Sequence, residues 1–240
     1  MFKVKIADVV FGVEPKYDAT QRIFTDYFYY GDDAPAFIAN ISNEIIDKVA
    51  SEVEGCHKSY AESLEVFREL AYYLLNNGLG MMIHASAVEV DGNAYLFTAL
   101  SGTGKSTHAR LWRKLLGSRA VMVNDDKPIL RFENGEFYVY GSPWMGKHYL
   151  GANIKAKVKA VCKLEQAPEN SIEKIPVPEM VLALFNQTVR PIDESGMDKL
   201  LFLLDKLLAK VKIYRLKCTP TLDAAKLSYS VMSGENIDEN

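Results

Sequence analysis

The segment Thr98–Trp112, TALSGTGKSTHARLW, constrains the fold of this chain more than any other part of its sequence. An apolar run, AYLFTAL, leads into the glycine-bearing stretch SGTGKST, and a helical pattern with apolar residues on one face follows at once. Glycine permits left-handed backbone angles and lets the main chain approach another group closely. The segment therefore predicts a strand, a glycine-bearing loop and a helix that begins directly after the loop.

A loop of this composition at the start of a helix predicts a phosphate-binding site. Backbone N–H groups at a helix N-terminus, aided by a lysine, bind phosphate groups. The sequence follows the pattern G-x-x-x-x-G-K-[ST], except that Ala99 occupies the first position. We expect Lys105 to reach the β- and γ-phosphates of a nucleotide and the Ser106 hydroxyl to hold Mg²⁺. The predicted phosphate-binding residues are Ser101, Gly102, Thr103, Gly104, Lys105, Ser106 and Thr107. The alternative is a glycine-rich helix cap with an incidental lysine.

Two adjacent carboxylates follow the next apolar run, AVMV, in the sequence Asn124-Asp125-Asp126. Phosphoryl transfer needs a metal anchor and a group that orients or deprotonates the attacking oxygen. Side chains alternate along a strand, so Asp125 and Asp126 are expected to point in opposite directions. One can then ligate Mg²⁺ while the other faces an acceptor hydroxyl. The alternative is a solvated turn in which the pair makes only local hydrogen bonds.

Two histidines lie close to the loop in the sequence. His84, in IHASAV, lies one predicted strand before the loop and is a candidate to approach the same phosphates. Its alternative is a strand histidine whose hydrogen bonds are satisfied locally. His108, inside the helix after the loop, is expected to be structural or to lie near the rim of a nucleotide.

Three further features are candidates for the acceptor side of a reaction. The segment Gly141–Lys147, GSPWMGK, combines glycines, an aromatic residue and a cation, and is a candidate mobile substrate loop. The alternative is a packed turn with Trp144 in the core. Arg190 and Arg215 are candidates to stabilise charge on a transferring phosphate, although the sequence does not place either of them.

The remaining patterns predict an α/β fold with a mixed, largely antiparallel sheet. Asp91-Gly92-Asn93 and Asn134-Gly135 are typical of tight hairpin turns. Strands joined by hairpins and interleaved with helices favour a mixed sheet over a purely parallel one. Other predicted elements are helices at 59–76 and 178–187, a helix opened by a capping box at Ser195-x-x-Asp198, a strand VKIYRLKC, and a terminal helix capped at Thr219-Pro220. We expect an N-terminal strand and helix region at 1–77 packed on a core at 78–232, and a flexible tail at 233–240.

Composition narrows the classes of partner and location. A net charge of -3, from 28 Lys and Arg against 31 Asp and Glu, gives no electrostatic reason to expect nucleic acid. The longest apolar runs, such as MVLALF, are far shorter than the roughly 20 residues that span a membrane. The start MFKVKIADVV lacks a signal-peptide pattern, and Cys56, Cys162 and Cys218 form no CxxC pair. We therefore expect a cytoplasmic protein with no membrane or nucleic-acid partner.

The three motifs IHASAV, LSGTGKST and VNDD, in this order along the chain, resemble the catalytic domain of bacterial HPr kinase/phosphorylase. The loop also resembles that of ATP-dependent phosphoenolpyruvate carboxykinase, and the match covers roughly residues 80–143. The resemblance implies a P-loop nucleotide-binding architecture of the HPr kinase and carboxykinase type, with ATP and Mg²⁺. It further implies that Asp125 acts as the base, that Asp126 binds Mg²⁺ and that His84 lies beside the transferring phosphate.

Together these features predict a stand-alone kinase that uses ATP and Mg²⁺. Its acceptor would be a serine, a threonine or another hydroxyl of a peptide, a protein or a small metabolite, and an oligomer is compatible with the sequence. Lys105, Asp125 and His84 are the expected catalytic residues, and Ser106 and Asp126 the expected metal ligands. The alternative is a nucleotide-binding sensor or scaffold module without catalysis.

Overall fold

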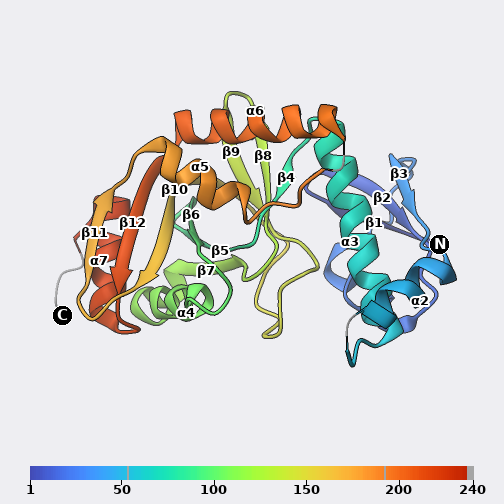
Figure 1. Cartoon of the computed structure of the whole chain (residues 1–240), viewed down its shortest axis with the longest axis horizontal. Helices are drawn as coiled ribbons and strands as arrows, with labels where there is room; N and C mark the ends of the chain where they lie inside the picture. The colour runs from blue at the N-terminus through green and yellow to red at the C-terminus, as the bar shows by residue number, and fades with distance from the viewer. Residues whose placement is uncertain (53, 192, 237–240) are drawn as a thin grey trace.

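The computed structural model describes residues 1–52, 54–191 and 193–236, and places their strands in two sheets (Figure 1). The smaller sheet belongs to the N-terminal region and has three strands in the order β1-β2-β3. The elements of this region are β1 (Phe2–Ile6), β2 (Val9–Val13), α1 (Asp18–Arg22), the 3₁₀ turn η1 (Thr25–Tyr27), β3 (Phe37–Ala39), α2 (Asn43–Glu52) and α3 (Lys58–Asn76).

The larger sheet has nine strands and is built around the long strand β10 (Lys155–Gln166). β10 runs parallel to β6 and β12 and antiparallel to β9, and the other strand pairs are antiparallel. The prediction of a mixed, largely antiparallel sheet is therefore confirmed. The other strands are β4 (Met81–Met82), β5 (Ala85–Val90), β6 (Asn93–Thr98), β7 (Ala120–Asn124), β8 (Ile129–Glu133), β9 (Glu136–Tyr140), β11 (Ser171–Lys174) and β12 (Lys212–Cys218).

Helices cover both faces of the larger sheet. On one face lie α5 (Val177–Phe185) and α6 (Glu194–Lys210), whose leucine stripe packs on the alanines and valines of the strands. On the other face lie α4 (Lys105–Leu116), the 3₁₀ turn η2 (Gly117–Arg119) and α7 (Leu222–Ser233). There Trp112 is buried among Tyr95, Phe97 and Tyr229, with ring centroids 5.0 to 5.2 Å apart. The apolar stripes of these amphipathic helices thus complete two layers of core.

The N-terminal region packs against β4, β8 and β9 at one end of the larger sheet. A third apolar core joins residues of β1, β2 and α3 to Met82, Ile129 and Tyr140 of the larger sheet. Within this region, the fully buried Glu62 accepts the main-chain N–H groups of Lys16 (2.6 Å) and Tyr17 (3.2 Å). Buried carboxylates need such partners because desolvation is costly without them. The predicted division of the chain into a region at 1–77 and a core at 78–232 stays a prediction.

Local sequence signals place most elements within one or two residues. The predicted helix at 59–76 is α3, and both predicted hairpin turns are present. In these turns Asp91 and Asn134 have φ of 49° and 51°, the left-handed region that such turns require. The capping prediction for α6 was wrong: the helix begins at Glu194, and Asp193 caps it by accepting the Gly196 N–H at 2.7 Å. Ser195 lies inside the first turn.

The terminal helix, α7, begins and ends slightly later in the chain than predicted. Ser233 still belongs to α7, and Gly234 (φ 83°) ends the helix in the left-handed conformation. The α7 helix begins after Thr221, so the predicted cap at Thr219 lies two residues too early. Residues 237–240 of the predicted tail lie outside the described residues. Among the helices that the structure describes, none is both long and apolar enough to cross a membrane.

Candidate functional site

The glycine-bearing loop lies between the end of β6 and the start of α4, so the predicted order of strand, loop and helix is confirmed. Gly102 and Gly104 have φ of 81° and 113°, and Gly104 is the N-cap of α4. A Cβ at either position would meet no heavy atom within 4 Å. The glycines are thus required by backbone conformation, and the space in front of the loop is open to a ligand.

Lys105 extends beneath this loop. Its side chain is only 6% exposed, and Nζ donates hydrogen bonds to the carbonyls of Ala99 (2.9 Å) and Leu100 (3.4 Å). Desolvation lowers the pKa of Lys105, while the charges of Asp126 and Asp125 act in the opposite direction. The loop therefore holds a buried cation within electrostatic reach of both predicted carboxylates.

Asn124 shapes the turn that carries these carboxylates, a role that the sequence analysis missed. Its fully buried side chain accepts the main-chain N–H groups of Asp126 (2.8 Å) and Lys127 (2.7 Å) through Oδ1. Its Nδ2 donates to the carbonyl of Ser142 at 3.0 Å. Asparagine commonly closes such turns by accepting N–H groups two or three residues on, and this signal was present at the end of the apolar run.

The two aspartates point to different partners, as their alternation predicts. Asp125 is buried, and its Oδ1 accepts a hydrogen bond of 2.6 Å from Ser86 Oγ on β5. The Asp126 side chain is 28% exposed, and its Oδ1 lies 3.3 Å from His84 Nε2 and 3.1 Å from Lys127 Nζ. The alternative of a solvated turn is wrong for Asp125. Ser86 and Lys127 were not singled out in the sequence.

His84 lies beside Asp126 as a neutral imidazole. Burial, with the charges of Lys127 and Lys105, lowers the pKa of His84 to about 4, although Asp126 and a hydrogen bond to Gln187 oppose this shift. The 3.3 Å contact between His84 and Asp126 is therefore not an ion pair at neutral pH. The main-chain N–H of His84 donates to the Gln187 carbonyl at 2.6 Å, which fixes this end of the sheet to the segment after α5.

The environment of His108 differs from that of His84 and supports a structural role for His108. It is buried on the face of the sheet covered by α4 and α7, its Nε2 lies 2.9 Å from Ser228 Oγ, and its ring packs on Phe97. Burial alone lowers the pKa of His108 to about 4. His108 also borders a cavity beside the loop, and its position near the rim of a nucleotide stays a prediction.

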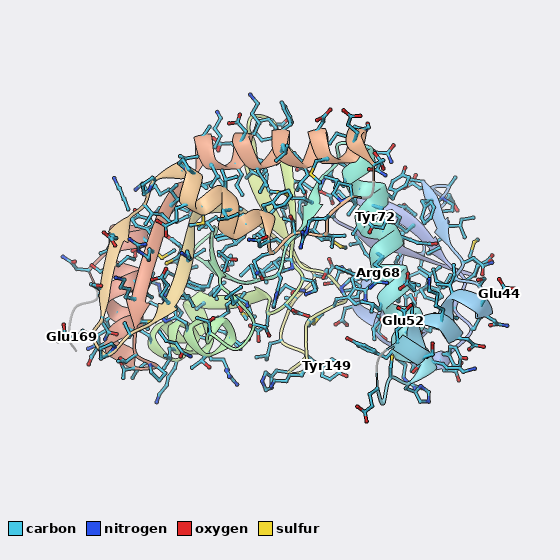
Figure 2. All side chains as sticks on the ribbon, in the orientation of Figure 1. Glu44, Glu52, Arg68, Tyr72, Tyr149 and Glu169 are labelled. Carbon is cyan, nitrogen blue, oxygen red and sulfur yellow. The ribbon has the colours of Figure 1, made fainter. Side chains whose placement is uncertain are left out.

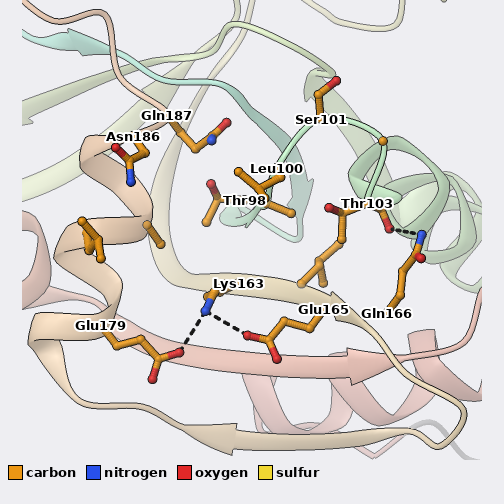
Figure 3. Close-up of a pocket in the computed structure, with 15 residues that line it drawn as sticks. Thr98, Leu100, Ser101, Thr103, Lys163, Glu165, Gln166, Glu179, Asn186 and Gln187 are labelled. Carbon is orange, nitrogen blue, oxygen red and sulfur yellow. Dashed lines mark hydrogen bonds and ion pairs between the residues drawn. The ribbon is translucent and has the colours of Figure 1, made fainter.

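Two of the cavities that the described residues form border the loop. The larger, of about 740 Å³, lies between the loop, the second half of β10 and α5 (Figure 3). On its floor Lys163 forms ion pairs with Glu165 (2.8 Å) and Glu179 (3.0 Å). The smaller, of about 440 Å³, lies beside the first turns of α4 and is bordered by Thr107 and Leu111. Both volumes are within the range of small-molecule sites, roughly 300–1,000 Å³.

Neither candidate arginine has the loop as its partner. Arg215 forms ion pairs with Glu173 (2.8 Å) and Glu179 (2.9 Å), and the Arg190 guanidinium lies 5.8 Å from the centre of the Phe185 ring. The structure therefore assigns both arginines to contacts within the sheet and α5. Their proposed role on a transferring phosphate stays untested.

The segment Gly141–Lys147 is anchored at its centre. Trp144 Nε1 donates to the carbonyl and hydroxyl of Ser63 on α3, both at 3.2 Å, and the indole packs edge-on against Phe24 and Phe67. The packed-turn alternative therefore describes Trp144. Beyond this anchor, Gly146 lies against Asp126, where an added Cβ would come within 3.1 Å of the Asp126 Cβ.

The residues predicted for Mg²⁺ are of the types used in a site that phosphate oxygens complete, and their joint role as ligands stays a prediction. Within the described ranges, no group of three or more His, Cys, Asp and Glu side chains forms a ready-made metal site. Mg²⁺ commonly takes one or two carboxylates together with substrate phosphates and water. Ser106, in the first turn of α4, and Asp126 supply a hydroxyl and a carboxylate of this kind.

No family model and no curated protein sequence matches this chain. Among solved structures, the HPr(Ser) kinase/phosphatase from Coxiella burnetii matches with 13% sequence identity, over 64% of this chain and 97% of that chain, at a TM-score of 0.36. This degree of similarity is too low to transfer the roles of residues between the two proteins.

Proposed function

We propose that this protein is an ATP- and Mg²⁺-dependent kinase that transfers a phosphoryl group to a hydroxyl. The observation that carries the proposal is the buried Lys105 under a glycine loop at a helix start, within electrostatic reach of Asp125 and Asp126. A cation, backbone donors and paired carboxylates are the components from which phosphoryl-transfer sites are built.

The loop and its lysine account for phosphate binding. The backbone from Ser101 to Thr107, at the start of α4, is proposed to hold the β- and γ-phosphates, with Lys105 as their fixed counter-charge. Ser106 and Asp126 are proposed to hold Mg²⁺, which would supply positive charge to neutralise the charge that develops on the phosphates. Because Lys105 is already fixed by two carbonyls, little reorganisation is needed to place its charge.

The two aspartates divide the remaining work. Asp125 is proposed to accept the proton of the attacking hydroxyl, and its hydrogen bond from Ser86 fixes the orientation of the carboxylate. Asp126 is proposed as the metal ligand, positioned by the Asn124 turn. The neutral His84, next to Asp126, is proposed to turn its one N–H towards a phosphate oxygen when nucleotide binds, a contact that adds no charge.

A nucleotide sensor or scaffold without catalysis is the second candidate. Such a module needs a phosphate loop and a metal ligand, but it has no use for a second carboxylate that is buried beside them. Asp125 is such a group, and burial of a charge costs free energy unless it is compensated. The buried Asp125 therefore favours the kinase.

The decisive experiment compares Lys105→Ala with Lys114→Ala, an exposed lysine on the same helix. Turnover of γ-labelled ATP should fall by about 10²–10³-fold in Lys105→Ala, the range observed when one fixed charge stabiliser is removed. Lys114→Ala should retain the parent rate. Full activity in Lys105→Ala would refute the assignment, and slow hydrolysis that is identical in the parent and in Asp125→Asn would favour the sensor.

The acceptor and surroundings of the enzyme are proposed on the same basis. We propose a serine, threonine or other hydroxyl of a peptide, protein or small metabolite as the acceptor, and the cytoplasm as the location. The net charge of -3 continues to argue against nucleic acid as a partner.

A further inference from the structure

A third cavity, of about 360 Å³, lies between the N-terminal region and the segment from Pro143 to Tyr149. Leu64 and Phe67 of α3 form part of one wall, and Trp144 and Met145 form part of the other. Asp126 also lines the cavity. The space is therefore largely apolar but contains the carboxylate that contacts His84.

We propose that this cavity binds the acceptor as a peptide segment of another protein, in which a bulky apolar side chain lies close to the serine or threonine that receives the phosphate. The inference rests on the proposed function. It adds the place where the acceptor binds and the chemistry by which it is recognised.

The position of the cavity connects it to the reacting groups. Asp126 Oδ1 lies 3.3 Å from His84 and 3.1 Å from Lys127, and Lys127 also lines the cavity. The cavity shares no lining residue with either cavity beside the loop. A group in this cavity can therefore reach Asp126 without occupying either cavity beside the loop.

The size of the cavity and the exposed rings around it favour a peptide. A volume of about 360 Å³ is near the lower end of the range for small-molecule sites and suits one or two side chains. Two tyrosines that line it, Tyr60 and Tyr149, are nevertheless 62% and 79% exposed. Figure 2 shows Tyr149 at the end of the loop between the two halves of the molecule. Tyrosine is enriched in protein interfaces, where the ring packs and the hydroxyl stays hydrated.

The charges around the cavity predict a second preference. Lys127 and the exposed Lys147 line it together with the single carboxylate of Asp126. An acidic residue next to the bulky apolar one would therefore be favoured at the mouth of the cavity. A basic peptide would be disfavoured there.

The walls are held before any ligand binds. Trp144 is fixed by its hydrogen bonds to Ser63, and Ser142, at the start of the segment, donates to the Lys127 carbonyl at 2.6 Å and accepts from Asn124 at 3.1 Å. A preformed wall reduces the entropy that binding must offset. The same hydrogen bonds tie the position of the cavity to the turn that carries Asp126.

The test uses the full-length protein, γ-labelled ATP and an oriented peptide library with one fixed serine and random flanking residues. We expect the phosphorylated pool to be enriched in aromatic or large aliphatic residues at one flanking position, with acidic residues enriched nearby. In Tyr60→Ala/Tyr149→Ala, the KM for a selected peptide should rise by at least about fivefold, the usual minimum for loss of an important interface side chain. The KM for ATP should not change.

Tyr30→Ala is the matched control, since Tyr30 is 89% exposed and does not line the cavity. It should behave as the parent. In Lys147→Glu the enrichment for acidic residues should disappear, while that for apolar residues persists.

The outcomes separate the inference from the proposed function. Phosphorylation without any flanking preference, or a preference and peptide KM that are unchanged in the tyrosine variant, would overturn the inference and leave the kinase intact. Turnover of ATP by the parent with no peptide phosphorylated would also overturn it, and would point to a small acceptor. If the parent neither binds nor turns over ATP, the proposed function fails and the inference fails with it.

Discussion

The loop region and the N-terminal region contribute to the proposed site in different ways. In the loop region, polar groups from short neighbouring segments meet at one end of the larger sheet: Lys105, Asp125 and Asp126, and His84. In the N-terminal region, α3 supplies the apolar wall formed by Leu64 and Phe67. The difference teaches that the proposed chemistry depends on local geometry, while the proposed recognition of the acceptor depends on packing between distant parts of the chain.

Substitution of the paired aspartates in the loop region is expected to have the largest effect on activity. Asp125→Asn should lower kcat by about 10²–10³-fold with little change in the Mg²⁺ requirement, because it removes a proton acceptor. Asp126→Asn should instead raise the Mg²⁺ concentration needed for half-maximal activity, because it removes a metal ligand. Titration of activity with Mg²⁺ in both variants measures this difference.

Asp205→Asn, an exposed substitution on α6, serves as the control for the aspartate pair. If Asp126→Asn lowers kcat without any change in Mg²⁺ dependence, and Asp125→Asn shows the opposite, the two roles are exchanged. Such an exchange would place the proton acceptor in the carboxylate that lines the third cavity.

The second-largest effect is a loss of folding stability in acid, and we expect it to come from His108 on α4, the helix that follows the loop. The folded-state pKa of His108 is about 4, below the usual value of 6.5, so the unfolded chain binds the proton more readily. Stability should therefore fall as the pH drops from 6.5 to 4 and become constant below that range. With about 1.36 kcal/mol per pKa unit, the loss from His108 is about 3 kcal/mol.

Urea unfolding of the parent and of His108→Gln between pH 7 and pH 4 measures this loss. The glutamine amide can keep a hydrogen bond to Ser228 without titrating, so the decline with falling pH should be smaller by about the same amount. An equal decline in both proteins would show that His108 is not responsible. Hydrogen exchange at pH 4.5 should rise first in α4 and α7.

The same difference explains what the sequence could and could not predict. The hairpins at Asp91 and Asn134 and the loop before α4 follow from local backbone requirements of glycine and asparagine, so short segments sufficed. The cap of α6 was misplaced because Asp193 and Ser195 are both good capping residues two positions apart. The wall formed by α3 and Trp144 joins residues that are about 80 apart in the sequence, and no local pattern reports such a contact.

The site residues show the same limit. Lys105, Asp125, Asp126 and His84 were found because they belong to motifs or follow a strand, but their roles remain predictions. Ser86 was missed because a serine in an apolar strand carries no distinctive pattern until its partner is known. Gln187 was missed for a similar reason. Its carbonyl accepts the main-chain N–H of His84, and these two residues are far apart in the sequence.

The third effect tests the N-terminal region alone. Glu62→Gln keeps the shape of a fully buried side chain but replaces one of the two oxygens that accept the N–H groups of Lys16 and Tyr17. A buried donor without its partner costs about 1–3 kcal/mol, so the free energy of unfolding should fall by that amount. Glu65→Gln, with a carboxylate that pairs with the exposed Arg68, is the matched control on the same helix.

Nucleotide affinity should be unchanged in Glu62→Gln, while the KM for a selected peptide should rise if α3 forms the acceptor wall. Calorimetric measurement of ATP binding and a peptide KM on the same preparation distinguish these results. A loss of nucleotide affinity equal to the loss of peptide affinity would show that the two regions are not separable in function.

The smallest effect distinguishes the two histidines with lowered pKa inside the loop region. Both have a pKa of about 4, but Lys127 and Lys105 contribute to the shift at His84, whereas burial alone accounts for His108. Phosphates bound to the loop would bring negative charge towards Lys105, so the pKa of His84 should rise by about one unit, and that of His108 should not. Titration of the two imidazoles by NMR with and without a non-hydrolysable ATP analogue measures both values in one sample. Equal shifts at both histidines would indicate a general change in structure, and no shift at His84 would place the phosphates away from Asp126. A rise at His84 alone would locate the reacting end of the nucleotide at the boundary between the two regions, where the acceptor must also arrive.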